Sequence, residues 1–393
     1  MKKTAAFLLS LVLLFAAASA AFAQEKASVT FPVYEDTEFG MAQIDASQEE
    51  FAELGAQFGD SLDVRFSNGY TVEDIPYYNG YYERVNHPAV VNYPGQGVAV
   101  AYCSGDSMWK LSGCVPGDSV TLTIREKGKY LERQNVMASV YTDDRDDYES
   151  DEAFANFRAM AGGKLRSDTF FRGASPLDNI HKRAAITDSL LKKAGVRFVL
   201  DLSDNEKKLI PHLEKEDFAS HHAASLLEKG EVILLGLSAS YRSDAYKASL
   251  AKGLLEMMRH EGPYYIHCTE GKDRTGFVCL LLEALADASY EEIEADYMKS
   301  YENYFGITKE SAGTKYEALK EMRLLDMLWW LADLPDNTDL AGMHFKEAAE
   351  DYLRSAGLTD EKIEKLENFL TEKNGSPMVS GSNQTPKAPA SPN

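Results

Sequence analysis

The pattern of apolar and polar positions changes near residue 150 and divides the chain into two parts. Between residues 24 and 142, short alternating runs such as Val120–Ile124 are separated by Gly, Asn and Pro, which is typical of β-strands joined by turns. From about residue 150, apolar strands alternate with segments of helical spacing, and residues 290–371 are almost wholly helical in pattern. The sequence therefore predicts a β-rich module followed by an α/β domain with a parallel or mixed sheet and covering helices.

The boundaries follow from composition. An acidic run at residues 143–147 indicates a linker over residues 143–150, so the β-rich module would span 24–142 and the α/β domain 151–373. Residues 374–393 are rich in Ser, Pro, Gly and Asn and are expected to be disordered. Within the α/β domain we predict strands at 196–200, 232–235 and 264–266, and helices at 184–194, 244–260 and 275–286.

Two segments of the β-rich module resemble each other. Residues 59–66 and 117–124 share a Gly-Asp-Ser start, and each is followed by a turn Gly and a Tyr. We interpret them as two similar hairpins of a small pseudo-symmetric barrel or sandwich. Residues 77–82, between them, hold four tyrosines, which either form a surface for a sugar or peptide partner or pack within the sheet.

The first residues resemble an export signal. Lys2 and Lys3 precede an uncharged apolar stretch from Ala5 to Ala18, and small residues lead to an A-x-A site that ends at Ala23. We predict a signal peptide over residues 1–23 rather than a membrane anchor, no later membrane span, and a periplasmic or extracellular protein. Its removal takes away two lysines, and the net charge changes from −21 to −23. Such a chain is a poor general binder of nucleic acid, so an anionic substrate needs a local positive site.

The four cysteines differ in context. Cys103 and Cys114 flank a hairpin-like segment and would be either a disulfide, if the protein is exported, or two buried thiols. Cys279 lies in an apolar helical segment and is expected in the core. Cys268 begins the loop that carries the candidate chemistry.

The segment from His267 to Gly276 lies between a predicted strand and a predicted helix. This arrangement points backbone N–H groups and a helix N-terminus into one concavity, which suits an anion. The helix dipole and Arg274 would favour the thiolate of Cys268, the reactive form of a cysteine nucleophile. Arg274 offers a planar fork for two phosphate oxygens, and Thr275 can donate a hydrogen bond to the thiolate. His267 is expected to order the loop.

The loop also contains residues expected to bind substrate, which are Thr269, Glu270, Gly271, Lys272 and Gly276. Lys272 is a second cation that would suit substrates with more than one phosphate. Glu270 works against highly charged substrates, so the two residues pull in opposite directions.

The segment resembles the His-Cys-x5-Arg-Ser/Thr loop of the tyrosine-phosphatase superfamily, and it fits the HCxxGKDRTG pattern of bacterial protein-tyrosine/lipid phosphatases. The likeness covers about residues 150–371 and includes segments 171–175, 195–202 and 349–358. It implies a cysteine-phosphatase fold and a two-step reaction through a phosphocysteine, with no metal or cofactor. Two departures are Gly173 after Arg172, and Ser203-Asp204 where an Arg-Ser pair is usual.

The resemblance also implies roles for particular residues. Arg172 would bind substrate, and Asp273 would protonate the leaving group. Asp244 is the alternative proton donor, although an Asp at that position also reads as a helix cap. Glu270 is a further carboxylate that could serve.

Phosphotyrosine in a protein or peptide is the first expected substrate class, followed by phosphoinositides and then by inositol polyphosphates. The competing hypotheses are a non-catalytic protein that binds a phosphate ligand, with the tyrosine-rich module recognising a surface partner, and a rhodanese-like sulfurtransferase. Intact Cys268, Arg274 and Thr275 argue against the non-catalytic protein. A sulfurtransferase shares a Cys-centred loop but does not need Arg274 and Thr275 in this arrangement.

Overall fold

The computed structural model describes residues 28–36, 39–93, 95–103 and 105–371. The predicted signal peptide and the predicted disordered tail lie outside these residues. The chain forms two compact units. The first runs to Asn135, apart from two short loops that group with the second, and the second begins at Val136.

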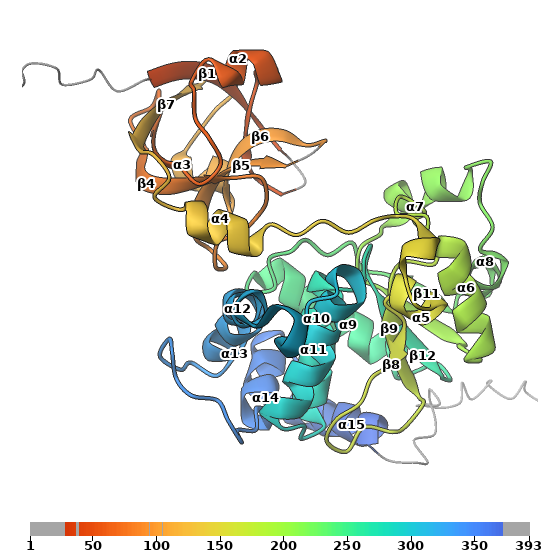
Figure 1. Ribbon diagram of the computed structural model, residues 1–393. Helices are drawn as coiled ribbons and strands as arrows, with labels where there is room; N and C mark the ends of the chain where they lie inside the picture. The colour runs from red at the N-terminus through yellow and green to blue at the C-terminus, as the bar shows by residue number, and fades with distance from the viewer. Residues whose placement is uncertain (1–27, 37–38, 94, 104, 372–393) are drawn as a thin grey trace, which may run out of the picture. The chain divides into compact units, whose positions relative to one another are not determined.

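The first unit is a closed barrel of seven strands (Figure 1). The order around the barrel is β1-β2-β6-β5-β4-β3-β7, and β1 pairs with β7 to close it. Because a closed barrel has no free strand edge, this small unit avoids exposed backbone donors and acceptors. Its strands are β1 (Ser28–Glu35), β2 (Ala42–Ile44), β3 (Ser61–Phe66), β4 (Thr71–Tyr78), β5 (Pro88–Tyr93), β6 (Gly97–Tyr102) and β7 (Ser119–Glu126), with short helices α2 (Gln48–Ala52), α3 (Met108–Ser112) and α4 (Leu131–Met137).

The β-rich module is confirmed, but the expectation of two hairpins is only half right. Strand β3 forms a hairpin with β4, whereas β7 leads into α4. The two similar segments pair with each other instead, with Leu62 opposite Ile124 and Phe66 opposite Val120. Tyr77 and Tyr78 are buried, so these two tyrosines pack within the barrel.

Cys103 and Cys114 are both buried thiols, and in the described chain they form no disulfide. Cys114 packs with the main barrel core, whereas Cys103 packs in a separate cluster with Tyr78, Ala89 and Val91. Of the two alternatives, the structure has the reduced, buried pair.

The second unit is an α/β domain built on a five-stranded sheet of order β11-β10-β12-β9-β8. Strands β11, β10, β12 and β9 are parallel, and β8 is antiparallel to β9. The strands are β8 (Arg158–Ala159), β9 (Phe170–Gly173), β10 (Phe198–Asp201), β11 (Val232–Leu234) and β12 (Tyr264–His267). The helices are η1 (Arg145–Asp147), α5 (Asp151–Phe154), α6 (Ala184–Lys193), α7 (Glu206–Leu213), α8 (His221–Glu228), α9 (Asp244–Met257), α10 (Asp273–Leu285), α11 (Tyr290–Phe305), α12 (Lys309–Leu319), the π-helix η2 (Lys320–Leu325), α13 (Asp326–Leu331), α14 (Lys346–Ser355) and α15 (Asp360–Thr371).

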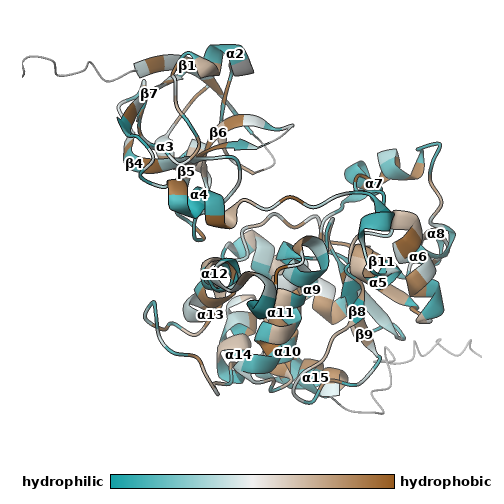
Figure 2. Cartoon of the chain, in the orientation of Figure 1, coloured by the Kyte–Doolittle hydropathy of each residue, from teal (hydrophilic) through white to brown (hydrophobic). Residues whose placement is uncertain are grey.

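Helices cover both faces of this sheet, as Figure 1 shows. Leu190 of α6 and Leu226 of α8 pack with Val199 and Tyr265 of the sheet, and these helices carry polar positions on their other side (Figure 2). Helices α9 and α10 contact the sheet through β10, β11, β12 and β9, and α10 also contacts α11 and α14. The predicted fold class is confirmed, with element ends shifted by up to three residues.

The acidic run lies inside the second unit. Asp143 forms an ion pair with Arg183, Nη1 to Oδ1, at 2.7 Å, and its carboxylate lies 3.2 Å from Nδ1 of His181. The unit boundary at residues 135 and 136 therefore precedes the segment that composition indicates as a linker. Across the described residues, no helix has both the length and the apolar character to cross a membrane.

Candidate active site

The candidate loop joins the end of strand β12 to the start of helix α10. Strand β12 lies between β10 and β9, and all four of its residues are buried. Because these three strands are parallel, their carboxyl ends meet at one edge of the sheet, where α/β proteins place their ligands. Cys268, at this edge, is 3% exposed.

Helix α10 begins without a side-chain cap. Lys272 occupies the cap position, and in the described structure no side chain accepts a hydrogen bond there. The first hydrogen bond of this turn runs from the Gly276 amide to the Lys272 carbonyl at 2.8 Å. The preceding amides of the first turn are therefore available to an anion, and the helix dipole favours negative charge at this end.

Arg274 lies across the loop. Its Nη2 donates to Oγ1 of Thr269 at 3.3 Å and its Nη1 to the Leu237 carbonyl at 3.1 Å. Burial opposes the charge of Arg274, but Cys268 and Asp201 outweigh burial and raise the pKa of the guanidinium. The thiol and the guanidinium are thus close enough to interact electrostatically.

Two buried hydroxyls beside this loop lack partners among the described residues. Oγ1 of Thr275 and the hydroxyl of Tyr246 accept and donate no hydrogen bond. Burial raises the pKa of Tyr246 and so does Cys268, whereas Arg274 lowers it. Buried polar groups are normally partnered, so these hydroxyls fit a site that a ligand completes. Tyr246 has no local signal in the sequence, because only folding brings α9 beside the loop.

A buried network of ion pairs and hydrogen bonds contacts the backbone of the loop at Gly271. Arg172 is fully buried, donates from Nη2 to the Gly271 carbonyl at 3.1 Å, and pairs through Nη1 with Asp296. Asp296 also pairs with Nε of Arg158 at 2.7 Å, and Asn156 donates to the Gly271 carbonyl at 3.1 Å. Arg172 was expected to bind substrate, but this placement gives it a positioning role, because it holds the loop backbone from below.

Gly271 and Gly276 are required by close packing. Gly271 has φ +68°, and a Cβ there would lie 2.0 Å from the Gly173 carbonyl oxygen. A Cβ on Gly276 would lie 2.8 Å from the ring of Tyr297. Close packing also explains the glycine that follows Arg172, because a Cβ on Gly173 would lie 2.6 Å from the hydroxyl of Tyr265.

Glu270 and Lys272 form an ion pair, Nζ to Oε2, at 2.9 Å. The other carboxylate oxygen of Glu270 accepts a hydrogen bond from the hydroxyl of Tyr141. Burial would raise the pKa of Glu270, but Lys272 and Tyr141 outweigh it and lower that pKa to about 2. A carboxylate held in this way is poorly suited to donate a proton at neutral pH.

An acidic pair, Asp201 and Asp204, lies at the end of strand β10, beside the loop. Oδ1 of Asp201 accepts from the amides of Ser203 and Asp204 at 2.8 and 3.0 Å. Its Oδ2 lies 3.8 Å from Nε2 of His267, whose Nδ1 lies 3.3 Å from the Cys268 carbonyl. Burial lowers the pKa of His267. Its expected role in ordering the loop stays a prediction. Burial and the Asp201 carboxylate raise the pKa of Asp204 to about 8.

The two candidate proton donors both lie at helix starts. Asp273 is the first residue of α10, its side chain is 59% exposed, and its carboxylate lies 3.7 Å from Nζ of Lys272. Asp244 is the first residue of α9, whose cap is the neighbouring Ser243. The cap of this helix is therefore Ser243, and not Asp244 as the helix-cap interpretation had it.

A family model described as "Tyrosine phosphatase family" matches residues 152–372, which is more than half of the chain. The chain belongs to the tyrosine phosphatase family. This result confirms the resemblance inferred from the loop, while membership of the bacterial protein-tyrosine/lipid subgroup stays a prediction.

Other comparisons add little to this family assignment. No curated protein matches the chain. Among solved structures, the chain is similar to the crystal structure of an uncharacterized conserved protein from Thermotoga maritima, with 19% identity and a TM-score of 0.22. That match covers 25% of this chain and 36% of the other, and at this TM-score it supports no conclusion.

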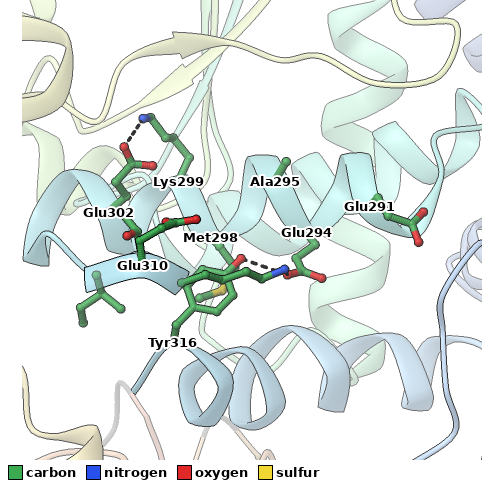
Figure 3. Close-up of a pocket in the computed structure, with 11 residues that line it drawn as sticks. Glu291, Glu294, Ala295, Met298, Lys299, Glu302, Glu310 and Tyr316 are labelled. Carbon is green, nitrogen blue, oxygen red and sulfur yellow. Dashed lines mark hydrogen bonds and ion pairs between the residues drawn. The ribbon is translucent and has the colours of Figure 1, made fainter. Parts of the chain in front are cut away.

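In this member of the tyrosine phosphatase family, a cavity of ≈ 530 Å³ lies away from the loop, between helices α11 and α12 (Figure 3). Glu294 is paired there with Lys309 at 2.9 Å, and Lys299 with Glu302 at 2.6 Å. None of its lining residues belongs to the segment from His267 to Gly276. The charged groups of this cavity are largely paired with one another. The loop from His267 to Gly276 is therefore the better candidate for the active site.

Proposed function

We propose that the protein is a phosphatase that hydrolyses phosphate monoesters through a covalent phosphocysteine at Cys268. The observation that carries this proposal is the uncapped start of α10, which lies beside a buried cysteine, an arginine and an unpartnered threonine hydroxyl. Membership of the tyrosine phosphatase family supports the same reaction.

In the first step, the thiolate of Cys268 attacks phosphorus, so an S–P bond forms and the bond from phosphorus to the leaving oxygen breaks. Asp273 gives the leaving oxygen its proton. The guanidinium of Arg274 and the free amides of the first turn of α10 stabilise the charge on the phosphoryl oxygens. These groups are cationic or polar hydrogen donors, so the proposal requires no metal for that neutralisation.

In the second step, water attacks phosphorus, the S–P bond breaks, and inorganic phosphate leaves. Asp273, now a carboxylate, takes the proton from water. Thr275 donates a hydrogen bond to the departing thiolate, which lowers the barrier to its release. The buried hydroxyl of Thr275 has no competing partner within the described chain.

Phosphotyrosine is the favoured substrate class. Tyr141, Tyr304 and Phe305 form an aromatic cluster beside Glu270 and Lys272, with ring centroids 5.1 Å apart for Tyr141 and Tyr304 and 5.5 Å for Tyr141 and Phe305. An aryl leaving group suits such a cluster, because aromatic pairs stack favourably. Phosphoinositides and inositol polyphosphates are the alternatives, and Lys272 is the residue that favours them.

The test is phosphate release by the wild type and by Cys268→Ser, in EDTA, from phosphotyrosine peptide, phosphoserine peptide, phosphoinositide and phytate. We expect release that survives EDTA, is fastest from phosphotyrosine, and is abolished in Cys268→Ser. Parallel measurements on Asp273→Asn and Asp244→Asn identify the proton donor, since its loss slows substrates with poor leaving groups most. No release by the folded wild type would favour the non-catalytic binding protein.

Export belongs to the same proposal, and it rests on the signal-type residues 1–23. The intact mass of the protein recovered from outside the cytoplasm is expected to correspond to a chain that starts at Gln24. A mass that retains residues 1–23 would contradict export with cleavage.

A further inference from the structure

Both oxygens of the Glu270 carboxylate are engaged by neighbours. Oε2 accepts from Nζ of Lys272 at 2.9 Å, and Oε1 accepts from the hydroxyl of Tyr141. His181 lies on the same side, with Nε2 3.9 Å from Oε1. Charge-assisted hydrogen bonds to both oxygens hold a carboxylate in one position more firmly than a single contact does.

The ammonium group of Lys272 is correspondingly occupied. Besides Glu270, it lies 3.7 Å from the carboxylate of Asp273 and 5.5 Å from the ring centre of Phe305. Burial disfavours the charge, but Asp273 and Glu270 outweigh burial and raise the pKa of Lys272. Lys272 is therefore already paired with the Glu270 carboxylate before any substrate arrives, whereas the hydrogen bonds of Arg274 go to neutral oxygens.

Tyr141 comes from outside the segment that matches the family, which begins at residue 152. It is fixed by its ring contacts with Tyr304 and Phe305 and by the guanidinium of Arg183, which lies 5.0 Å from its ring centre. Asp143, two residues after Tyr141, forms an ion pair with Arg183. The segment before the family domain thus contributes a well-packed hydroxyl to the phosphate loop.

We propose that Glu270, held in place by Tyr141, is a specificity-determining residue that restricts the site to substrates with a single phosphate group. A second phosphate near Lys272 would have to displace the Glu270 carboxylate or lie beside it, and two anions at that separation repel each other. Removing the carboxylate would release Lys272 as a partner for a second phosphate. This proposal rests on the proposed phosphatase function, and it names the substrate class of that site.

The experiment compares kcat/KM for phosphotyrosine with kcat/KM for a soluble vicinal inositol bisphosphate. We expect the ratio of kcat/KM for the bisphosphate to kcat/KM for phosphotyrosine to rise about tenfold in Glu270→Gln. This factor corresponds to the loss of one charge–charge repulsion of modest strength. Tyr141→Phe, which keeps the ring packing and removes the hydroxyl, is expected to shift the ratio in the same direction by a smaller factor.

The matched control is Glu302→Gln. It removes the same charge from a Lys–Glu pair of similar length, Lys299 with Glu302 at 2.6 Å, and is expected to leave the ratio unchanged. Thermal melting establishes that each variant is folded, and Tyr141→Phe carries the test if Glu270→Gln is not. An unchanged ratio in the folded variants, with wild-type activity intact, overturns the specificity role alone. No release from either substrate by the folded wild type overturns the phosphatase proposal and this one with it.

Discussion

Helices α10 and α11 contact each other, yet their N-termini are built in opposite ways. Helix α11 begins behind Ser289, whose hydroxyl accepts from the Glu292 amide at 3.3 Å, while the Glu292 carboxylate accepts from the Ser289 amide at 2.8 Å. Helix α10 begins behind Lys272 and has no such cap in the described structure. A capped start satisfies its own amides, whereas an uncapped start next to Cys268 and Arg274 leaves them for a ligand.

The difference extends to the groups around the two helix starts. Near α10, Oγ1 of Thr275 and Oδ2 of Asp204 are buried without partners among the described residues. Near α11, the Glu292 carboxylate also accepts from the Gly163 amide at 3.2 Å, so the cap itself is supported. Unsatisfied buried polar groups destabilise a fold, and proteins retain them chiefly at functional sites. The comparison therefore separates a helix start whose amides are satisfied by its own cap from one whose amides are left for a ligand.

The largest effect is expected from Arg274→Lys. Lysine keeps the charge but has no planar fork for two phosphoryl oxygens, so kcat should fall about 100- to 1000-fold, as for loss of one transition-state donor. Steady-state kinetics on phosphotyrosine peptide measures this fall. Arg259→Lys, at an exposed ion pair with Glu256, is the matched control. A fall no larger than that of the control would mean that the open start of α10 is not the reacting site.

A smaller, pH-dependent effect is expected from Asp204→Asn. An unfolded Asp releases its proton near pH 3.8, whereas folded Asp204 keeps it up to a pKa of about 8, so rising pH favours unfolding between these values. The variant lacks this titration, and by about pH 8 it should be more stable than the wild type by about 1–3 kcal/mol. Urea unfolding at acidic and mildly alkaline pH measures the difference. A stability difference that does not grow with pH would contradict the buried, protonated state of this carboxyl.

The smallest effect is expected from Ser289→Ala, on the capped side of the comparison. Loss of an N-cap hydroxyl should lower the free energy of unfolding by about 1 kcal/mol. The same variant should leave kcat unchanged, because the α11 cap holds no substrate. Thermal melting and steady-state kinetics on one preparation provide both values. A fall in kcat at unchanged stability would show that the two helix starts do not divide stability and catalysis as described.

The sequence predicts the elements that depend on local pattern. The apolar run at 264–266 becomes β12, and the helical spacing at 275–286 becomes α10, so the loop between them could be located from periodicity alone. The helical segment after residue 290 is likewise confirmed. For β12 and α10 the pattern suffices because β12 lies inside the sheet and α10 packs against β12 and β9.

The sequence does not predict contacts between distant segments. Tyr141 contacts Glu270 across 129 residues, and Arg172 reaches Gly271 across 99, so neither role has a local signal. The family resemblance implies that Arg172 binds substrate, but its burial and its pairing with Asp296 give it the positioning role. The pairing of β3 with β7 was missed for the same reason, since similar segments can pair with each other as well as form separate hairpins.

The most direct measurement is the identification of the covalent intermediate. Wild-type protein is mixed with phosphotyrosine peptide and quenched rapidly, and its mass and the modified residue are determined by mass spectrometry. The account predicts the addition of one phosphoryl group, located on Cys268 and absent from Cys268→Ser. Steady phosphate release with the phosphoryl group on another residue, or an adduct that persists in Cys268→Ser, would contradict the central claim that Cys268 is the nucleophile.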